Sequence, residues 1–524
     1  MAITEGYDYP HSGNTSYVVQ YTRGLLGVNI KLDNLLTQIL CGTLGAACVV
    51  VLAARFGQMW NAYMRRITSA HASPRQQRYW ATAESALWAD IKRHLVYAPL
   101  GRKRHNREFK LSEAVNVGTL PSRLHTILLT SYFLSQVAYI TILDYNVNER
   151  AALIAELRGR CGVLAVLNMI PRHGRDNSHG IIATPLAIPD TSCLLRNFLA
   201  HTYSCIMAFW ITERSLRFLR LIYLNIAHRH GITRVMVEAL PGEASRVTFF
   251  LPRNTHIHPG SHVYAYLPRI SLWMSHPFSV AWTENGKYPR PLVSSSRTSP
   301  QKLPSFQKHE SDIDNATNYS SKPTNVTLVM AARTGMTRKL YEKALASPDN
   351  TFFTTGFIEG PYRSHSSTFF GSYGTVVLFS GGAGITHHMM QVRELLECAD
   401  AGTIATRRIH LIWSVRTTEQ LTWVSGFMDY ILQLPKRREM LVTKLFISKP
   451  RSHKDIRSPS GTLLMFEGRC RPDVIIDEAM EKHVGATAVS VCGPGAFADE
   501  VRAAVRKRVG SGPVIDFVEE AFTW

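Results

Sequence analysis

The sequence lacks the patterns that mark several common protein classes. Its eight cysteines include no CxxC pair and lie scattered along the chain, so a disulfide framework is not expected. The N-terminus has no charged region followed by an early apolar run, so no cleavable signal peptide is expected. No motif interleaves aromatic and basic residues, which argues against a nucleic-acid-binding protein.

Acidic residues are scarce relative to basic ones. The chain of 524 residues has 59 Lys and Arg against 39 Asp and Glu, a net charge of +20. Such an excess suits nucleic acid, anionic lipid or a phosphorylated ligand, and the missing motif favours the last two. Hydrophobic residues make up 45% of the chain, an ordinary share for a globular protein, so any membrane part must be local. The length predicts two or three domains.

Long apolar runs lie in the first part of the chain, and three are long enough to cross a bilayer. These predicted crossings are residues 35–53, 124–143 and 193–212. A fourth run, residues 151–170, is interrupted by Glu156, Arg158 and Arg160, so its crossing is left open. The alternative is that such runs are buried helices of a soluble core.

The loop between the first two runs is rich in Lys and Arg, which marks it as cytoplasmic. The N-terminus is then outside, in agreement with a glycosylation sequon at Asn14. Three crossings leave the C-terminal half in the cytosol, whereas four would leave it outside. We therefore expect residues 1–230 to form an α-helical, multi-pass membrane region that is followed by a cytosolic half.

Residues 231–371 change to short alternating runs separated by Pro and Gly turns, which predicts a small antiparallel β-barrel. One run contains His276, Pro277, Phe278 and Ser279. A flavin needs a flat apolar slot and a small hydroxyl near its N5 atom, and Phe278 and Ser279 supply such groups. Alone, this tetrapeptide is more often an ordinary strand end. Residues 291–324, rich in Ser, Pro, Lys and Asn, are expected to be a disordered insertion.

A second segment of the barrel domain, residues 333–341, predicts the start of a helix at Gly335 and Thr337. The free amides of such a helix start suit a pyrophosphate. The expected flavin site therefore combines a strand with the first turn of a helix.

Residues 372–524 predict an α/β domain with a parallel sheet and a nucleotide site. Residues 375–380 form a buried-strand run, which a glycine turn and a helix start follow. This combination cradles phosphate, because the backbone approaches closely and a helix N-terminus faces the anion. The residues of this turn are Gly381, Gly382, Gly384, Ile385 and Thr386. The turn is not a full GxGxxG motif, so it does not identify a nucleotide site by itself.

Later strands of this domain carry further candidates. The second strand ends at Arg416, whose guanidinium suits the 2′-phosphate of NADPH, although an exposed arginine at a strand end needs no such role. The third strand runs into Cys492, Gly493 and Pro494, and the last leads to an aromatic tail that ends at Trp524.

In this order, the motifs resemble those of the ferric reductase and NADPH oxidase superfamily, with the details of fungal ferric-chelate reductases. The tetrapeptide at 276–279 resembles the family's flavin motif, and the turn at 381–386 resembles its NADPH phosphate loop. The tripeptide at 492–494 resembles its CGP motif, whose cysteine lies beside the nicotinamide. The final FVEEAFTW resembles its C-terminal signature, in which a terminal aromatic residue is expected near the flavin.

The resemblance implies a ferredoxin-reductase-like module in which FAD and NADPH bind at the motifs above. It assigns catalytic roles to Ser279, Cys492 and Trp524. It also implies a plasma-membrane enzyme that passes electrons from NADPH through FAD and haem b to an extracellular ferric chelate, in support of iron or copper uptake. The expected partners are this small-molecule acceptor and the lipid bilayer. The alternatives are an NADPH oxidase that produces superoxide, and a haem-less diaphorase or inactive remnant.

The haem ligands of the family are not found in this sequence. Family members hold two haems with paired histidines fourteen residues apart, an offset of about 21 Å along a helix. Only His262 and His276 show that offset, and they lie in the predicted barrel, so we interpret it as a coincidence. A short polar stretch, residues 172–180, stands where the family has further helices. His201 is a candidate remnant ligand, but one histidine cannot hold two such haems.

Overall fold

The structure is a computed structural model that describes residues 29–520 with gaps at 102–107, 113–114, 144, 146–149, 173–192, 229–230, 273, 286–323, 363–366, 453–455, 457, 459 and 511. The chain forms two compact units, one of Met1–Phe56 and Ile127–Phe218 and the other of Gly57–Thr126 and Leu219–Trp524. The insertion predicted at 291–324, except for its last residue, and Trp524 fall outside the described residues. The predicted domain boundaries at 230/231 and 371/372 remain predictions.

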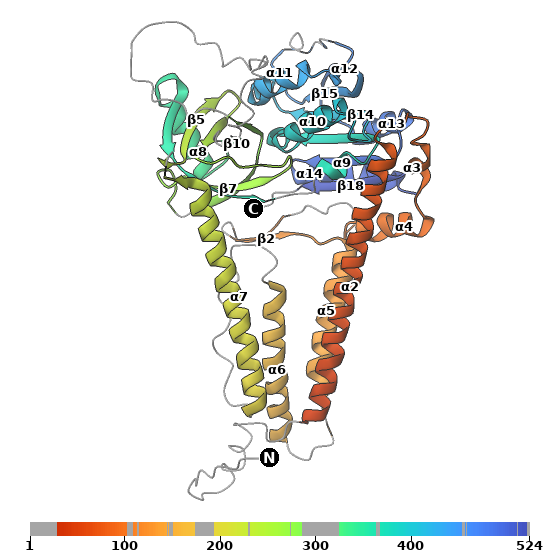
Figure 1. Ribbon diagram of the computed structural model, residues 1–524, viewed down its shortest axis with the longest axis vertical. Coiled ribbons are helices and arrows are strands. Elements are labelled where there is room, and N and C mark those ends of the chain that lie inside the picture. Colours follow the sequence, from red (N-terminus) through yellow and green to blue (C-terminus); the bar gives the residue numbers. More distant parts are fainter. Residues whose placement is uncertain are drawn as a thin grey trace, which may run out of the picture. The chain divides into compact units, whose positions relative to one another are not determined.

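Helices form at all the apolar runs, and the greater part of each belongs to the first unit (Figure 1). They are α2 (Ile30–Ser69), α5 (Arg123–Thr141), α6 (Arg150–Arg172) and α7 (Cys193–Asn225). Helix α2 is long and apolar enough to cross a membrane, and its Val50 and Leu52 side chains are 67% exposed. Among the described residues it is the one helix that meets this test of length and composition. The crossings at 124–143 and 193–212 therefore stay predictions.

A buried and paired arginine explains how the apolar run at 151–170 accommodates charged side chains. The Arg160 side chain is fully buried; its Nε donates to Asp33 Oδ1 (2.8 Å) and its Nη1 to the Tyr139 carbonyl oxygen (2.9 Å). It also pairs with Glu156, one turn earlier on α6. Buried charges are tolerated where partners of this kind satisfy them. These residues, which break the hydrophobic pattern, thus connect α6 to α2 and α5.

The part of the second unit that was predicted to bind the flavin, here called the flavin-side domain, consists of antiparallel strands, as predicted. One sheet has the strand order β11-β5-β6-β10-β9, the other β12-β7-β8. Their bounds are β5 (Arg234–Leu240), β6 (Ala244–Phe250), β7 (His262–Tyr266), β8 (Ser275–Ser279), β9 (Trp282–Asn285), β10 (Thr324–Ala331), β11 (Thr351–Thr355) and β12 (Phe357–Tyr362). Helix α8 (Met336–Leu345) follows β10, and the short pair β3 (Ile226–Ala227) and β4 (Gly231–Ile232) precedes β5. Inward-facing Val, Leu and Phe side chains fill the core of this domain.

The nucleotide-side domain is built on a parallel sheet, also as predicted, and helices cover both faces of this sheet. Its strand order is β16-β15-β14-β13-β17-β18. The strands are β13 (Thr375–Gly381), β14 (Arg408–Val415), β15 (Leu441–Ile447), β16 (Leu463–Glu467), β17 (Thr487–Cys492) and β18 (Ile515–Glu520). Helices α10 (Ile385–Asp400) and α11 (Ser425–Gln433) pack on one face, and α13 (Pro472–Glu481) and α14 (Gly495–Arg508) on the other (Figure 1). The chain builds outward from β13 to β16 and then returns to β17, so the order switches between β13 and β17. Ligands of open α/β sheets bind at such a switch point, beyond the carboxyl ends of the strands.

The predicted cytoplasmic loop after the first apolar run packs on this sheet. It contains α3 (Arg78–Thr82), α4 (Ala86–Ile91), a π-helix (Lys92–Val96), β1 (Glu108–Ser112) and β2 (Val115–Thr119). Lys92 Nζ lies 2.8 Å from Asp516 Oδ1 in β18, and Gln77 Nε2 donates to the Ala405 carbonyl oxygen (2.9 Å). Part of the region that the sequence assigned to the membrane therefore belongs to the same compact unit as the nucleotide-side domain.

Candidate functional site

Three predicted loops meet at one edge of the parallel sheet. The predicted phosphate loop (residues 381–386) begins with the last residue of β13, residues 492–494 begin with the last residue of β17, and Arg416 follows β14. In register, Ser380 lies opposite Cys492, and Gly381 lies opposite Ser414. Because these strands are parallel neighbours, their carboxyl ends lie together at the switch point. The structure thus brings together residues that are more than 100 positions apart in the sequence.

Glycine is required where two of these loops touch. A Cβ atom at Gly384 would lie 2.1 Å from the Cys492 carbonyl oxygen, and one at Gly381 would lie 2.6 Å from Pro494 Cδ. A Cβ atom at Gly493 would lie 2.9 Å from Gly381 Cα. Since real side chains do not tolerate such contacts, the two loops pack backbone against backbone. This packing holds the two loops together, and at Gly382, where a Cβ atom would meet nothing within 4 Å, a ligand can approach the main chain closely.

The first turn of α10 is open to an anion. The Ile385 N–H donates to the Gly382 and Ala383 carbonyl oxygens, while Gly384, at the N-terminal cap, offers no side-chain acceptor to the later amides of that turn. Such amides, together with the helix dipole, favour a phosphate group. Gly382 has φ = +53°, and its carbonyl oxygen accepts a hydrogen bond from Trp413 Nε1 (3.0 Å) in β14. Trp413 therefore fixes the loop from the neighbouring strand, a contact that the sequence did not predict.

Cys492 is suited to shaping a pocket rather than to acting as a nucleophile. Its side chain is buried at the end of β17. Burial, and secondarily the charges of Glu520 and Glu519, raise the pKa of the Cys492 thiol far above its ordinary value. The group therefore stays a neutral thiol at physiological pH, whereas attack on an electrophile requires a thiolate.

Arg416 has a second cation beside it. The Arg416 side chain is exposed, and its backbone N–H donates to Gln420 Oε1 (2.8 Å). The Arg416 carbonyl oxygen accepts from the backbone N–H of Lys449 (2.8 Å), which follows β15. Lys449 is also exposed. Two positive side chains thus start from adjacent backbone at the edge of the sheet, and the sequence did not point to Lys449.

The predicted flavin tetrapeptide forms most of β8. This strand pairs only with β7 in its sheet, where Ser279 lies opposite His262 and Phe278 opposite Val263. Ser279 is 8% exposed, and Phe278 is partly buried against the domain core. Burial lowers the pKa of His276, so its imidazole is neutral near pH 7. His262 and His276 belong to antiparallel neighbours and not to one helix, which supports reading their spacing as a coincidence.

The second predicted flavin segment forms a helix start. Gly335 has φ = +63° at the N-terminal cap of α8 and supplies no side-chain acceptor to the first-turn amides. The Thr337 hydroxyl accepts from the Arg333 backbone N–H (3.1 Å) and donates to the Thr334 carbonyl oxygen (3.3 Å). Thr337 therefore orders the loop before the helix, and the amides of that turn suit a pyrophosphate.

The described C-terminal strand also reaches the switch point. Strand β18 ends at Glu520, which lies opposite Cys492 in β17. The predicted catalytic Trp524 follows four residues later, outside the described residues.

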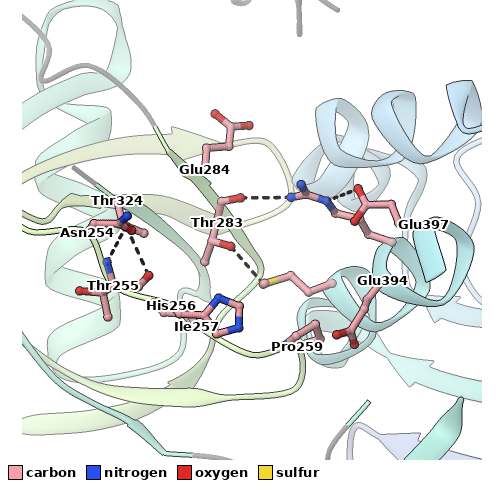
Figure 2. Close-up of a pocket in the computed structure, with 12 residues that line it drawn as sticks. Asn254, Thr255, His256, Ile257, Pro259, Thr283, Glu284, Thr324, Glu394 and Glu397 are labelled. Carbon is pink, nitrogen blue, oxygen red and sulfur yellow. Dashed lines mark hydrogen bonds and ion pairs between the residues drawn. The ribbon is translucent and has the colours of Figure 1, made fainter. Parts of the chain in front are cut away.

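A cavity of about 410 Å³ lies elsewhere, between the two domains of this unit (Figure 2). The loop Asn254–Pro259 and Thr283 line one side, and α10 lines the other. Across it, Arg393 donates to the Thr283 carbonyl oxygen (3.2 Å), and within α10 the same side chain donates to Glu397 Oε1 (2.9 Å). None of the predicted site residues lines this cavity.

Family models match both domains of the module. Residues 229–303 match an FAD-binding domain, and residues 373–506 match the ferric reductase NAD binding domain. Over 237 residues the chain is 25% identical to a probable cell surface ferric reductase, kap2, of Aspergillus oryzae. Over 335 residues it is 22% identical to ferric/cupric reductase transmembrane component 2 of Schizosaccharomyces pombe.

These matches cover 44% and 60% of this chain, and 27% and 56% of the two relatives. The chain thus spans about a quarter to about half of the length of these relatives. Among solved structures, the ferredoxin reductase in carbazole 1,9a-dioxygenase is 14% identical with a TM-score of 0.32, and covers 55% of this chain and 69% of its own. A ferredoxin NADP+ reductase from Neisseria gonorrhoeae is 12% identical with a TM-score of 0.33, and covers 55% of this chain and 98% of its own.

Proposed function

The chain belongs to the ferric reductase superfamily, and from this premise we propose that it is a membrane flavoenzyme that takes electrons from NADPH and delivers them to a ferric chelate. The observation that carries the proposal is the contact between the 381–386 and 492–494 loops, where no side chain fits between the backbones. With the open space at Gly382 and the start of α10 beside it, this switch point suits a dinucleotide.

Different residues of the proposed site bind different parts of NADPH and FAD. The amides at the start of α10 hold the NADPH pyrophosphate, and Arg416 and Lys449 take its 2′-phosphate. The loop that starts at Cys492 encloses the nicotinamide. The start of α8 at Gly335 and Thr337 holds the FAD pyrophosphate, and strand β8 carries the flavin ring against Phe278 and Ser279.

When bound, FAD accepts a hydride from NADPH and releases electrons singly to an acceptor, and this chemistry belongs to the cofactor. The protein's part is to align the two rings and to exclude water. The neutral thiol of Cys492 adds no charge of its own beside the nicotinamide. The proposed place of Trp524 is at the flavin face, four residues after the end of β18.

The onward route through haem does not fit the described residues. Helices α2, α5, α6 and α7, as the structure bounds them, contain only His125 and His201, on different helices. A pair of histidines fourteen residues apart on one helix, which would stack two haems, is therefore missing from them. We derive no step through haem. The proposed multi-pass topology, the plasma membrane location and the role in iron or copper uptake rest on the relatives alone.

The two alternative functions predict different measurements. With the full chain in detergent or proteoliposomes, the proposal predicts NADPH-dependent reduction of a ferric chelate. An NADPH oxidase would instead form superoxide at a rate that exceeds ferric reduction. A diaphorase would reduce only a soluble dye and no ferric chelate. Failure to reduce any of these acceptors, with FAD bound, would refute all the catalytic readings.

A further inference from the structure

A buried histidine links the two strands on which the nucleotide loops end. His388 lies in the first turn of α10, and its side chain is fully buried. Its Nδ1 lies 2.7 Å from the Ser380 hydroxyl in β13, and its Nε2 lies 3.1 Å from the Ser490 hydroxyl in β17. Both serines are fully buried as well. One imidazole ring thus joins a helix to two neighbouring strands.

The positions of these serines relate the histidine to the loops. Ser380 directly precedes Gly381, and Ser490 stands two residues before Cys492. The loops that follow make the close backbone contacts described above. His388 therefore lies beneath the switch point and holds the start of α10 and both loop-bearing strands at a fixed spacing.

The bridge works with a neutral ring. Burial, and secondarily His387, hold the pKa of His388 well below its ordinary value. A neutral imidazole has one N–H donor and one acceptor nitrogen, and each serine hydroxyl can take the complementary role. Both ring nitrogens are then satisfied without placing a charge in the core.

We propose that His388 is a positioning residue for the nicotinamide nucleotide: through Ser380 and Ser490 it sets the spacing between the 381–386 and 492–494 loops. It does not touch the ligand itself. The inference rests on the proposed function in so far as the ligand is NADPH. Its geometric part, the fixed spacing of the loops, holds for any dinucleotide and can be measured without one.

The first test compares three variants of the full-length, FAD-loaded protein without nucleotide. His388→Phe removes both hydrogen bonds but keeps an aromatic ring, and His410→Phe makes the same change at another histidine of this domain, in β14. Hydrogen–deuterium exchange should increase in both loops in His388→Phe and in neither loop in His410→Phe. Ser380→Ala should loosen the same loops. Unchanged exchange in both loops of His388→Phe would overturn the inference.

The second test measures the affinity for NADP⁺ by calorimetry. For His388→Phe we expect a Kd about tenfold higher than that of the wild type, as the loss of two hydrogen bonds predicts. His388→Gln, which keeps one polar contact, should recover part of this loss, and the Kd for FAD should not change. An unchanged Kd for NADP⁺ in His388→Phe would contradict the inference. If the wild type itself does not bind NADP⁺, the proposed function is wrong, and the exchange experiment still decides the role of His388.

Discussion

At the scale of single residues, the proposed nucleotide loops depend on glycine for their packing against each other. Gly384→Ala places a Cβ atom 2.1 Å from the Cys492 carbonyl oxygen, so the two loops must separate. We expect the KM for NADPH to rise at least about tenfold, because the phosphate loop then loses its position. The measurement is NADPH-dependent dye reduction.

A glycine in open space provides the matched control for that change. A Cβ atom at Gly461 would meet nothing within 4 Å, so Gly461→Ala should leave the KM for NADPH unchanged. Equal effects of the two substitutions would show that the contact between the loops has no bearing on nucleotide binding.

Arg416 allows a test of the preference for NADPH over NADH. Arg416→Ala removes a cation from the proposed 2′-phosphate site, so the KM for NADPH should rise roughly 10- to 100-fold while that for NADH stays the same. Arg408→Ala, at the other end of β14, is the control and should change neither value. If the wild type prefers NADH, the proposed roles of Arg416 and Lys449 are wrong.

The residues that sequence reasoning found share a local signal, and those that it missed do not. Gly381, Gly384 and Cys492 follow strand-like runs, so glycine turns and strand ends pointed to them. Trp413 and His388 act across the sheet. Because their partners lie in neighbouring strands, no spacing in the sequence shows their roles before the strand order is known.

At the scale of elements, strand β14 carries a group that makes the fold sensitive to acid. Burial, and next the charge of Lys444, lower the pKa of His410 to about 4, with smaller opposing or added effects of Glu478, Arg408 and Lys482. In the described part of the chain its Nε2 has no hydrogen-bond partner. Above pH 6.5 the ring is neutral in both the folded and unfolded states.

Between pH 6.5 and about 4, the unfolded chain binds a proton at His410 that the folded chain does not. As the pH is lowered through this window, the free energy of unfolding should therefore fall by up to ~1.4 kcal/mol for each pH unit. His410→Phe should remove this part of the slope, as measured by denaturant unfolding across that pH range. Parallel slopes in the variant and wild type would exclude His410 as the cause.

The helices and strands also show how far the sequence patterns predicted the fold. Alternating runs with Pro and Gly turns predicted the antiparallel domain, and buried runs between helices predicted the parallel sheet. Arg160 weakened the prediction for the run at 151–170, yet α6 is a helix whose charge is satisfied by Asp33 and by a carbonyl oxygen. A hydropathy profile penalises a charged residue whether or not the fold pairs it. For this reason the profile of residues 151–170 was ambiguous.

At the scale of the whole molecule, residues distant in sequence hold the nucleotide-side domain together. Lys92 is nearly fully buried, lies 2.8 Å from Asp516 and also pairs with Glu84. Lys92→Met leaves the half-buried Glu84 without this cation and Asp516 with Arg65 alone (3.8 Å), which should cost on the order of 2–3 kcal/mol of stability. The measurement is the free energy of unfolding of this domain.

An exposed lysine serves as the comparison. Lys507 pairs with Asp473 at the surface, where its side chain is 67% exposed, so Lys507→Met should change stability by less than about 1 kcal/mol. A Lys92→Met protein as stable as the wild type would mean that the segment 57–126 does not support the sheet. No pattern in the sequence predicted this support, because a basic loop after an apolar run indicates only its side of the membrane.

The central claim is that one module of this chain moves electrons from NADPH to FAD. The most direct test is anaerobic mixing of the purified, FAD-loaded protein with NADPH while the absorbance of oxidised flavin is followed. We predict that the flavin bleaches fully with one equivalent of NADPH, faster than with NADH, and that Gly384→Ala slows it. A flavin that stays oxidised in the presence of excess NADPH would contradict the account.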